Sequence, residues 1–191
     1  MKTELKIIRF FIGDKEPRTI REISKKIKAD YRITYLAVQK LIDKKIILHK
    51  KVGTSLLCEL NEEYYGFEIY QAEDERRKEL FRNKNIQQIS KEIASKAGTS
   101  MFILVLFGSY AKGRQSQSSD IDLIFISNEG GFENKIQTLL SLLPLKIHAL
   151  FFTEEEFIRM KDAKKSNVIK EAIDNHIILY NIESYYHLKN A

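Results

Sequence analysis

The sequence has a single cysteine, Cys58, so no disulfide can form within the chain. Its few cysteine and histidine residues show no spacing typical of a metal site, and such a chain suits a reducing compartment. The longest apolar run, Met101 to Phe107, is far shorter than the roughly 20 residues of a membrane-spanning helix. The charged start Met1-Lys2-Thr3-Glu4 does not lead into a signal-peptide core. We therefore expect a cytoplasmic protein with no membrane partner.

The sequence is rich in apolar and charged residues. The composition, 43% hydrophobic and 30% charged, suffices for one sizeable core or two small ones. Residues 1–60 carry 15 Lys or Arg against 7 Asp or Glu, whereas residues 61–191 carry 17 against 19. A basic first third favours a polyanionic partner for that part of the chain. Lysines that only keep the surface soluble are the alternative explanation.

Residues 1–43 show helical periodicity in three segments. The first ends near Gly13, and the second begins at a capping box in which Thr19 and Glu22 exchange hydrogen bonds with each other's backbone amides. A third helix follows Asp30, which can cap it. The residues of this helix expected to be buried are Ile33, Ala37, Leu41 and Ile42. Those expected to point outward are Arg32, Tyr35, Gln39 and Lys40.

A hairpin is predicted next, with residues 46–52 and 55–60 as strands around a Gly53-Thr54 turn. Helix, tight turn, helix and hairpin together resemble the winged helix-turn-helix domains of many archaeal and bacterial regulators. That resemblance implies binding of double-stranded DNA, with the third helix in the major groove and Lys50 and Lys51 of the wing on phosphates. A module that only contacts protein is the alternative, and the resemblance is compatible with a homodimer.

Residues 61–100 are predicted to form a helical connector, as one long helix or two consecutive helices. The stretch from Glu62 to Lys96 is charged and nearly free of glycine and proline, with apolar residues at helical intervals. Gly98 stands where a left-handed residue after a helix is expected. The predicted organisation is thus a first domain at 1–60, this connector, and a catalytic-type domain at 101–191.

The chemistry is concentrated between residues 101 and 126. The apolar run of Met101 to Phe107 predicts a strand buried on both faces, and it ends at Gly108-Ser109. Backbone amides at such a turn suit a phosphate, and Lys112, Arg114 and the polar residues up to Ser119 add polar and basic groups there. Asp120 and Asp122 alternate along the next strand, so both carboxylates project to one side, where they favour a hard cation such as Mg²⁺.

These residues, Gly108-Ser109, a short polar loop and Ser118-Ser119-Asp120-Ile121-Asp122, resemble the signature of minimal nucleotidyltransferases of the polymerase-beta superfamily. The resemblance covers about Phe102 to Tyr180. It implies an α+β fold with a mixed sheet, and binding of Mg²⁺ and of ATP or another nucleoside triphosphate. Gly108 and Ser109 would hold the outer phosphates, while Asp120 and Asp122 would bind the metal.

One position departs from this pattern. The superfamily generally uses a third carboxylate on a neighbouring strand, and the candidate strand at 145–152 contains no Asp or Glu. His148 falls about where that carboxylate is expected, so it is either a catalytic group that accepts a proton or binds metal, or a hydrogen-bonded strand histidine. Glu154 to Glu156 belong to a capping box opened by Thr153.

Three functions are compatible with the sequence. The first is transfer of a nucleoside monophosphate to a hydroxyl acceptor. The second is DNA-binding regulation, with a transferase-like domain that senses nucleotide or is inactive. The third, modification of a partner toxin by an antitoxin-type transferase, ranks last because those proteins are commonly short and lack an added winged helix.

Overall fold

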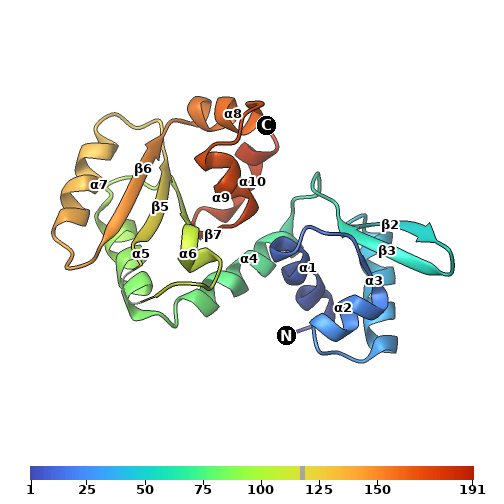
Figure 1. Cartoon of the computed structure of the whole chain (residues 1–191). Coiled ribbons are helices and arrows are strands. Elements are labelled where there is room, and N and C mark those ends of the chain that lie inside the picture. The colour runs from blue at the N-terminus through green and yellow to red at the C-terminus, as the bar shows by residue number, and fades with distance from the viewer. Residues whose placement is uncertain (117–118) are drawn as a thin grey trace. The chain divides into compact units, whose positions relative to one another are not determined.

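The computed structural model describes residues 1–116 and 119–191, which fold into two compact units (Figure 1). The first unit is Met1–Glu73 and the second is Asp74–Ala191. The division falls inside helix α4 (Phe67–Leu80), whereas the boundaries predicted from the sequence are at residues 60 and 100. Each unit has its own sheet and its own buried apolar residues.

Three helices form the core of the first unit: α1 (Thr3–Gly13), α2 (Ile20–Lys26) and α3 (Tyr31–Asp43). Each helix buries one apolar stripe, as an amphipathic helix on a small core must. The most buried members of the three stripes are Ile7, Ile8, Phe11, Ile23, Val38 and Leu41. The three helices predicted from the periodicity of this segment are therefore confirmed.

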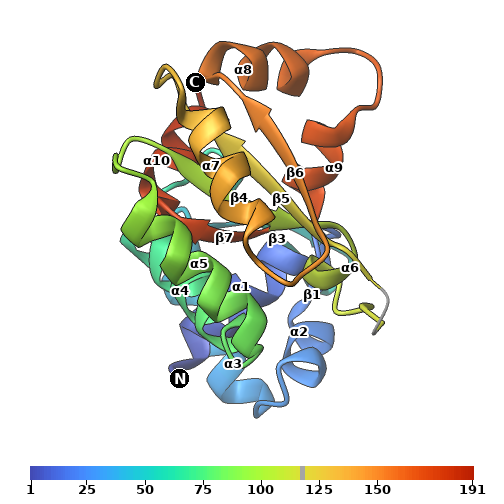
Figure 2. The same cartoon turned by 90° about the vertical axis from the view of Figure 1, so that its left-hand side faces the viewer.

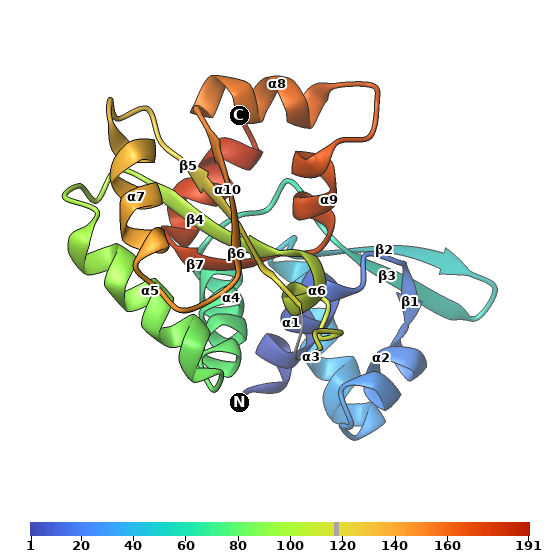
Figure 3. The same cartoon turned by 60° about the vertical axis from the view of Figure 1, so that its left-hand side comes forward.

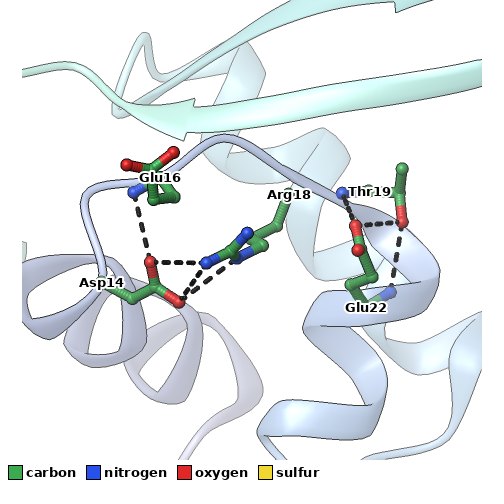
Figure 4. A network of polar contacts seen from close by, with 5 residues as sticks. All are labelled: Asp14, Glu16, Arg18, Thr19 and Glu22. Carbon is green, nitrogen blue, oxygen red and sulfur yellow. Dashed lines mark hydrogen bonds and ion pairs between the residues drawn. The ribbon is translucent and has the colours of Figure 1, made fainter.

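Hydrogen bonds at the start of α2 confirm the predicted capping box (Figure 4). The Glu22 amide donates to Thr19 Oγ1 at 3.3 Å, and the Thr19 amide donates to Glu22 Oε2 at 2.8 Å. These bonds lower the pKa of the Glu22 carboxyl. Just upstream, the Arg18 guanidinium donates to both carboxylate oxygens of Asp14, which ties the chain leaving α1 to the residues that enter α2.

The sheet of the first unit contains the predicted hairpin and one strand that the sequence did not reveal. Strands β2 (Ile47–Val52) and β3 (Ser55–Leu60) pair antiparallel, and Gly53 adopts φ 59° in the turn between them. The added strand, β1 (Arg18–Thr19), pairs with the other side of β3. Cys58 on β3 is fully buried, and burial raises the pKa of its thiol to about 11.

Helix α3 has a different buried face from the one predicted. Its buried residues are Thr34, Ala37, Val38 and Leu41, whereas Ile33 is 55% exposed and Ile42 is half-buried. The stripe follows the 0, 3, 4, 7 spacing of an α-helix but begins one residue later than the apolar pattern indicates. Thr34 can be buried because its hydroxyl donates to the Asp30 carbonyl. The prediction that Ile33 is buried was therefore wrong.

The second unit is built on a four-stranded mixed sheet of order β6-β5-β4-β7. Its strands are β4 (Ile103–Phe107), β5 (Ile121–Ile126), β6 (Ile147–Phe152) and β7 (Ile177–Tyr180). Strand β4 pairs antiparallel with both neighbours, and β5 pairs parallel with β6. Every residue of β4 is buried, as its continuous apolar run predicts. The unit is thus α+β with a mixed sheet, as expected.

Helices cover both faces of this sheet (Figures 1 and 2). One face packs against α5 (Lys84–Lys96) and α7 (Phe132–Ser141), with Leu106, Leu123 and Phe125 in the shared core. The other face is covered by α8 (Glu154–Asp162), α9 (Val168–Asp174) and α10 (Ile182–Lys189). The one-turn helix α6 (Gly108–Ala111) lies at the end of β4 (Figure 3). None of the helices in 1–116 and 119–191 has the length and apolar character needed to cross a membrane.

The capping box of α2 predicts a measurable stability effect. Thr19→Ala removes the acceptor of the Glu22 amide and should lower the free energy of unfolding by about 1 kcal/mol. The bond between the Thr19 amide and the Glu22 carboxylate should weaken as the pH falls through the lowered pKa of Glu22. Chemical denaturation followed by circular dichroism measures both effects. Thr3→Ala is a matched control, because the structure describes no hydrogen bond from the Thr3 side chain; equal effects of the two substitutions would contradict the prediction.

Candidate active site

Strand β4 delivers the chain to the candidate site through a turn that requires glycine. Five buried apolar residues fix the strand, and the next residue, Gly108, has φ 68°. Side chains other than glycine rarely adopt this left-handed conformation. Ser109 follows in the single turn of α6, where the chain reverses direction. The predicted end of the buried strand and the observed turn coincide at Gly108.

The carboxylate of Asp122 lies directly against this turn. Phe107 is the register partner of Asp122 in the antiparallel pair of β4 and β5. A Cβ atom placed on Gly108 would come within 2.1 Å of Asp122 Oδ2, which is much closer than real contacts allow. Gly108 is therefore needed twice, for its backbone conformation and for the space that the carboxylate occupies.

His148 lies on the other side of Asp122. The two residues are register partners in the parallel pair of β5 and β6, and His148 Nδ1 is 3.2 Å from Asp122 Oδ1. The Asp122 side chain is 25% exposed and the His148 side chain 57% exposed, so both are accessible to a ligand. One carboxylate thus faces Gly108 with one oxygen and His148 with the other.

Asp120 comes immediately before β5 and is exposed. Between the two acids, Ile121 packs in the core against α5 and α7, as do Leu123 and Phe125, so the predicted core face of this strand is confirmed. The Ile121 amide donates to the Lys146 carbonyl at 2.9 Å, which extends the pairing with the chain before β6 up to this point.

Three further predicted residues lie around the turn. Lys112 Nζ is 2.9 Å from Glu171 Oε1 on α9, while Arg114 is exposed and donates its amide to the Ser109 carbonyl. The Ser119 hydroxyl accepts from the Ser116 amide at 2.8 Å. Ser118, which belongs to the sequence motif, lies outside the described residues. Glu171 was not predicted from the sequence, because no local sequence pattern links it to Lys112, which is far away in the chain.

The acidic side chains at the candidate site suit a metal ion that is held only partly by protein. Within 1–116 and 119–191, no group of three or more His, Cys, Asp or Glu side chains is arranged to hold a metal ion. Mg²⁺ is commonly held in proteins by one or two carboxylates, with waters and substrate phosphates completing its shell. The accessible carboxylate of Asp122 beside a glycine turn, with Asp120 two residues away, fits that mode of binding.

The residues predicted to bind DNA belong to the first unit. Arg32, Tyr35 and Lys40 are exposed on α3 and Gln39 is half-buried, while Lys50 and Lys51 are exposed on β2 next to the turn. Lys40 Nζ also lies 3.4 Å from Glu4 Oε1, a weak surface pair. Most of these basic groups are therefore free to meet an anionic partner.

A mixed sheet whose buried strand ends at a glycine turn facing an aspartate agrees with the nucleotidyltransferase motif in the sequence. A comparison with protein-family models agrees: the family described as "Polymerase beta, Nucleotidyltransferase" matches residues 78–185, more than half of the chain. The chain belongs to this family. A search of curated proteins gave no match. The matched segment includes the whole mixed sheet and helix α5.

Gly108→Ala should destabilise the second unit more than an ordinary glycine substitution does. Gly113 is a matched control, because its φ is 63° and a Cβ there would meet nothing within 4 Å. Both substitutions carry the left-handed cost of about 1 kcal/mol, and only Gly108→Ala adds the clash with Asp122. Thermal unfolding of the two variants measures the difference. In a chain that also carries Asp122→Ala, Gly108→Ala should no longer be more destabilising than Gly113→Ala. If the extra destabilisation persists in that chain, the proposed close contact is refuted.

Proposed function

We propose that this protein transfers a nucleoside monophosphate from ATP or another nucleoside triphosphate to a hydroxyl acceptor, and that its first unit is a DNA-binding winged helix-turn-helix. The observation that carries the first part is the contact of Gly108 with the Asp122 carboxylate in a chain of the polymerase-beta nucleotidyltransferase family. This contact puts a backbone turn suited to phosphate beside a ligand suited to a divalent cation.

The turn would hold the outer phosphates. Ser109 can donate its hydroxyl to a phosphate oxygen, and α6 begins directly at the end of β4, where the first amides of a helix have no partner within the helix. Lys112 is tied to Glu171 by a surface ion pair, which is weak enough for a phosphate to replace the carboxylate. Arg114 and Ser119 complete the proposed set of nucleotide-binding residues.

Asp120 and Asp122 would hold Mg²⁺, which when bound neutralises charge that develops on the phosphates. In the reaction, the acceptor oxygen forms a bond to the α-phosphorus while the bond from that phosphorus to the pyrophosphate oxygen breaks. The hydroxyl proton must leave the acceptor oxygen. If His148 Nδ1 donates to Asp122, Nε2 is left to accept this proton, and the exposure of the ring allows a substrate to reach it.

The second candidate function is DNA-binding regulation with a nucleotide-sensing or inactive transferase-like domain. It is favoured by the composition of β6, where an imidazole and not a carboxylate faces Asp122. In this alternative, His148 only holds the Asp122 side chain in place. Nucleotide would then bind at the same turn without being consumed.

A label-transfer assay with radiolabelled ATP, Mg²⁺ and a panel of hydroxyl acceptors separates the two candidates. Asp120→Asn and Asp122→Asn should each reduce transfer at least about 100-fold, because each removes charge that acts in the transition state. Asp162→Asn on α8 should leave transfer unchanged, since its side chain is 67% exposed and lies outside the proposed site. Nucleotide binding without transfer to any acceptor would favour the regulator.

The winged-helix proposal rests on the exposed basic groups of α3 and β2 and on the charge excess of residues 1–60. Replacing Arg32, Lys50 and Lys51 with alanine should weaken binding to duplex DNA and reduce the slope of log affinity against log salt by about 1 for each lost phosphate contact. Fluorescence anisotropy at several salt concentrations measures this slope.

The control removes the same charge elsewhere: Lys91, Lys164 and Lys165 are exposed on the second unit and can be replaced together. If the two triple variants bind DNA alike, or if the parent chain does not bind duplex, then the first unit is a protein-contact module.

A further inference from the structure

The first unit contains a hollow that shares one residue, Tyr35, with the proposed duplex contacts. Its volume is about 760 Å³, within the range of pockets that enclose small organic molecules. It is lined by residues of α2, of the first half of α3 and of the turn of the β2–β3 hairpin. Its lining residues include Arg21, Lys25, Tyr31, Tyr35 and Thr54.

The charge of the hollow is positive. Arg21 and Lys25 line it, and no Asp or Glu is found among its described lining residues. Neither cation takes part in a salt bridge in the part of the chain that the structure describes. Glu22, the acid next to Arg21 in sequence, directs its carboxylate to the Thr19 amide and hydroxyl (Figure 4). An anionic group entering the hollow would therefore meet two available cations.

Two tyrosine rings add a flat apolar surface. Tyr31 and Tyr35 are 53% and 41% exposed, although aromatic side chains contribute most to stability when they are buried. They stand one helical turn apart on α3, with ring centroids 6.5 Å apart and planes tilted by 32°. At this distance and tilt the rings are not closely stacked, so ring faces remain available. Thr54 and Ser55 of the hairpin add hydroxyl groups to the lining.

Aromatic faces beside free cations match the two parts of a nucleotide. Proteins bind single-stranded nucleic acids by stacking bases on aromatic rings and by tracking the phosphates with lysine and arginine. A base inside a duplex has both faces covered by its neighbours, so an open hollow that offers ring faces suits an unpaired base. Of the α3 side chains predicted to contact a duplex, Tyr35 lines the hollow, whereas Arg32, Gln39 and Lys40 are not among its described lining residues.

We propose that this hollow binds an unpaired nucleotide of a nucleic acid, with its base on the ring of Tyr31 and its phosphate at Arg21 and Lys25. The first unit then prefers a nucleic acid that carries a single-stranded segment over a blunt duplex. This inference goes beyond the proposed winged-helix contacts and does not depend on nucleotidyl transfer in the second unit.

The experiment uses the full-length chain and two fluorescent DNA probes: a short blunt duplex, and the same duplex extended at one 3′ end by a run of thymidines. Anisotropy titrations should show about tenfold tighter binding of the extended probe, which corresponds to the stacking of one base. Tyr31→Ala should abolish this preference, and Tyr31→Phe should keep it because the ring remains. Arg21→Gln with Lys25→Gln should weaken binding of the extended probe and leave the blunt duplex nearly unchanged.

Tyr31 lies at the exposed start of α3, so its replacement leaves the buried core intact, which circular dichroism can verify. Equal affinity of the parent chain for both probes, or an unchanged preference in Tyr31→Ala, would overturn the inference. These results are distinguishable from failure of the proposed function. If the chain binds both probes equally well, only the proposed role of the hollow is refuted. If it binds the extended probe but not the blunt duplex, only the proposed duplex contacts are refuted.

Discussion

The second unit depends on how closely strand β4 can approach Asp122 at its end. The pairing of Phe107 with Asp122 sets the register, and the absence of a side chain on Gly108 leaves room for the carboxylate. A slip of β5 by one residue would be costly, because it would turn the Asp122 carboxylate to the core face that Ile121, Leu123 and Phe125 occupy. The geometry of the candidate site is thus held by the core of the sheet.

Local signals made much of this arrangement predictable. The apolar run before Gly108 indicates a strand buried on both faces, and alternation after Asp120 separates core residues from the acids. Both capping boxes, at Thr19 and at Thr153, involve residues three apart in sequence, so their hydrogen bonds need no knowledge of the tertiary structure. The position of His148 opposite Asp122 agrees with the expectation, drawn from the resemblance to the superfamily, that this residue stands where the third carboxylate is usually found.

Other features depend on contacts between distant residues and carry no local signal. The buried stripe of α3 begins at Thr34 because its hydroxyl is satisfied by the Asp30 carbonyl, and hydrophobicity alone favours Ile33 instead. The pairing of Lys112 with Glu171 needs α9 to pack near the end of β4, which only the folded chain reveals. The short strand β1 is likewise defined by its partner β3 and not by its own two residues.

The position of His148 has an evolutionary consequence. Strand β6 is at one edge of the sheet, and the His148 side chain points into a largely open environment. Exchanges at such a position alter few packing contacts, so selection can change the group opposite Asp122 while leaving the fold's stability almost untouched. The group that faces Asp122 can therefore change between imidazole and carboxylate with little effect on folding, because β6 is an edge strand and this side chain is exposed.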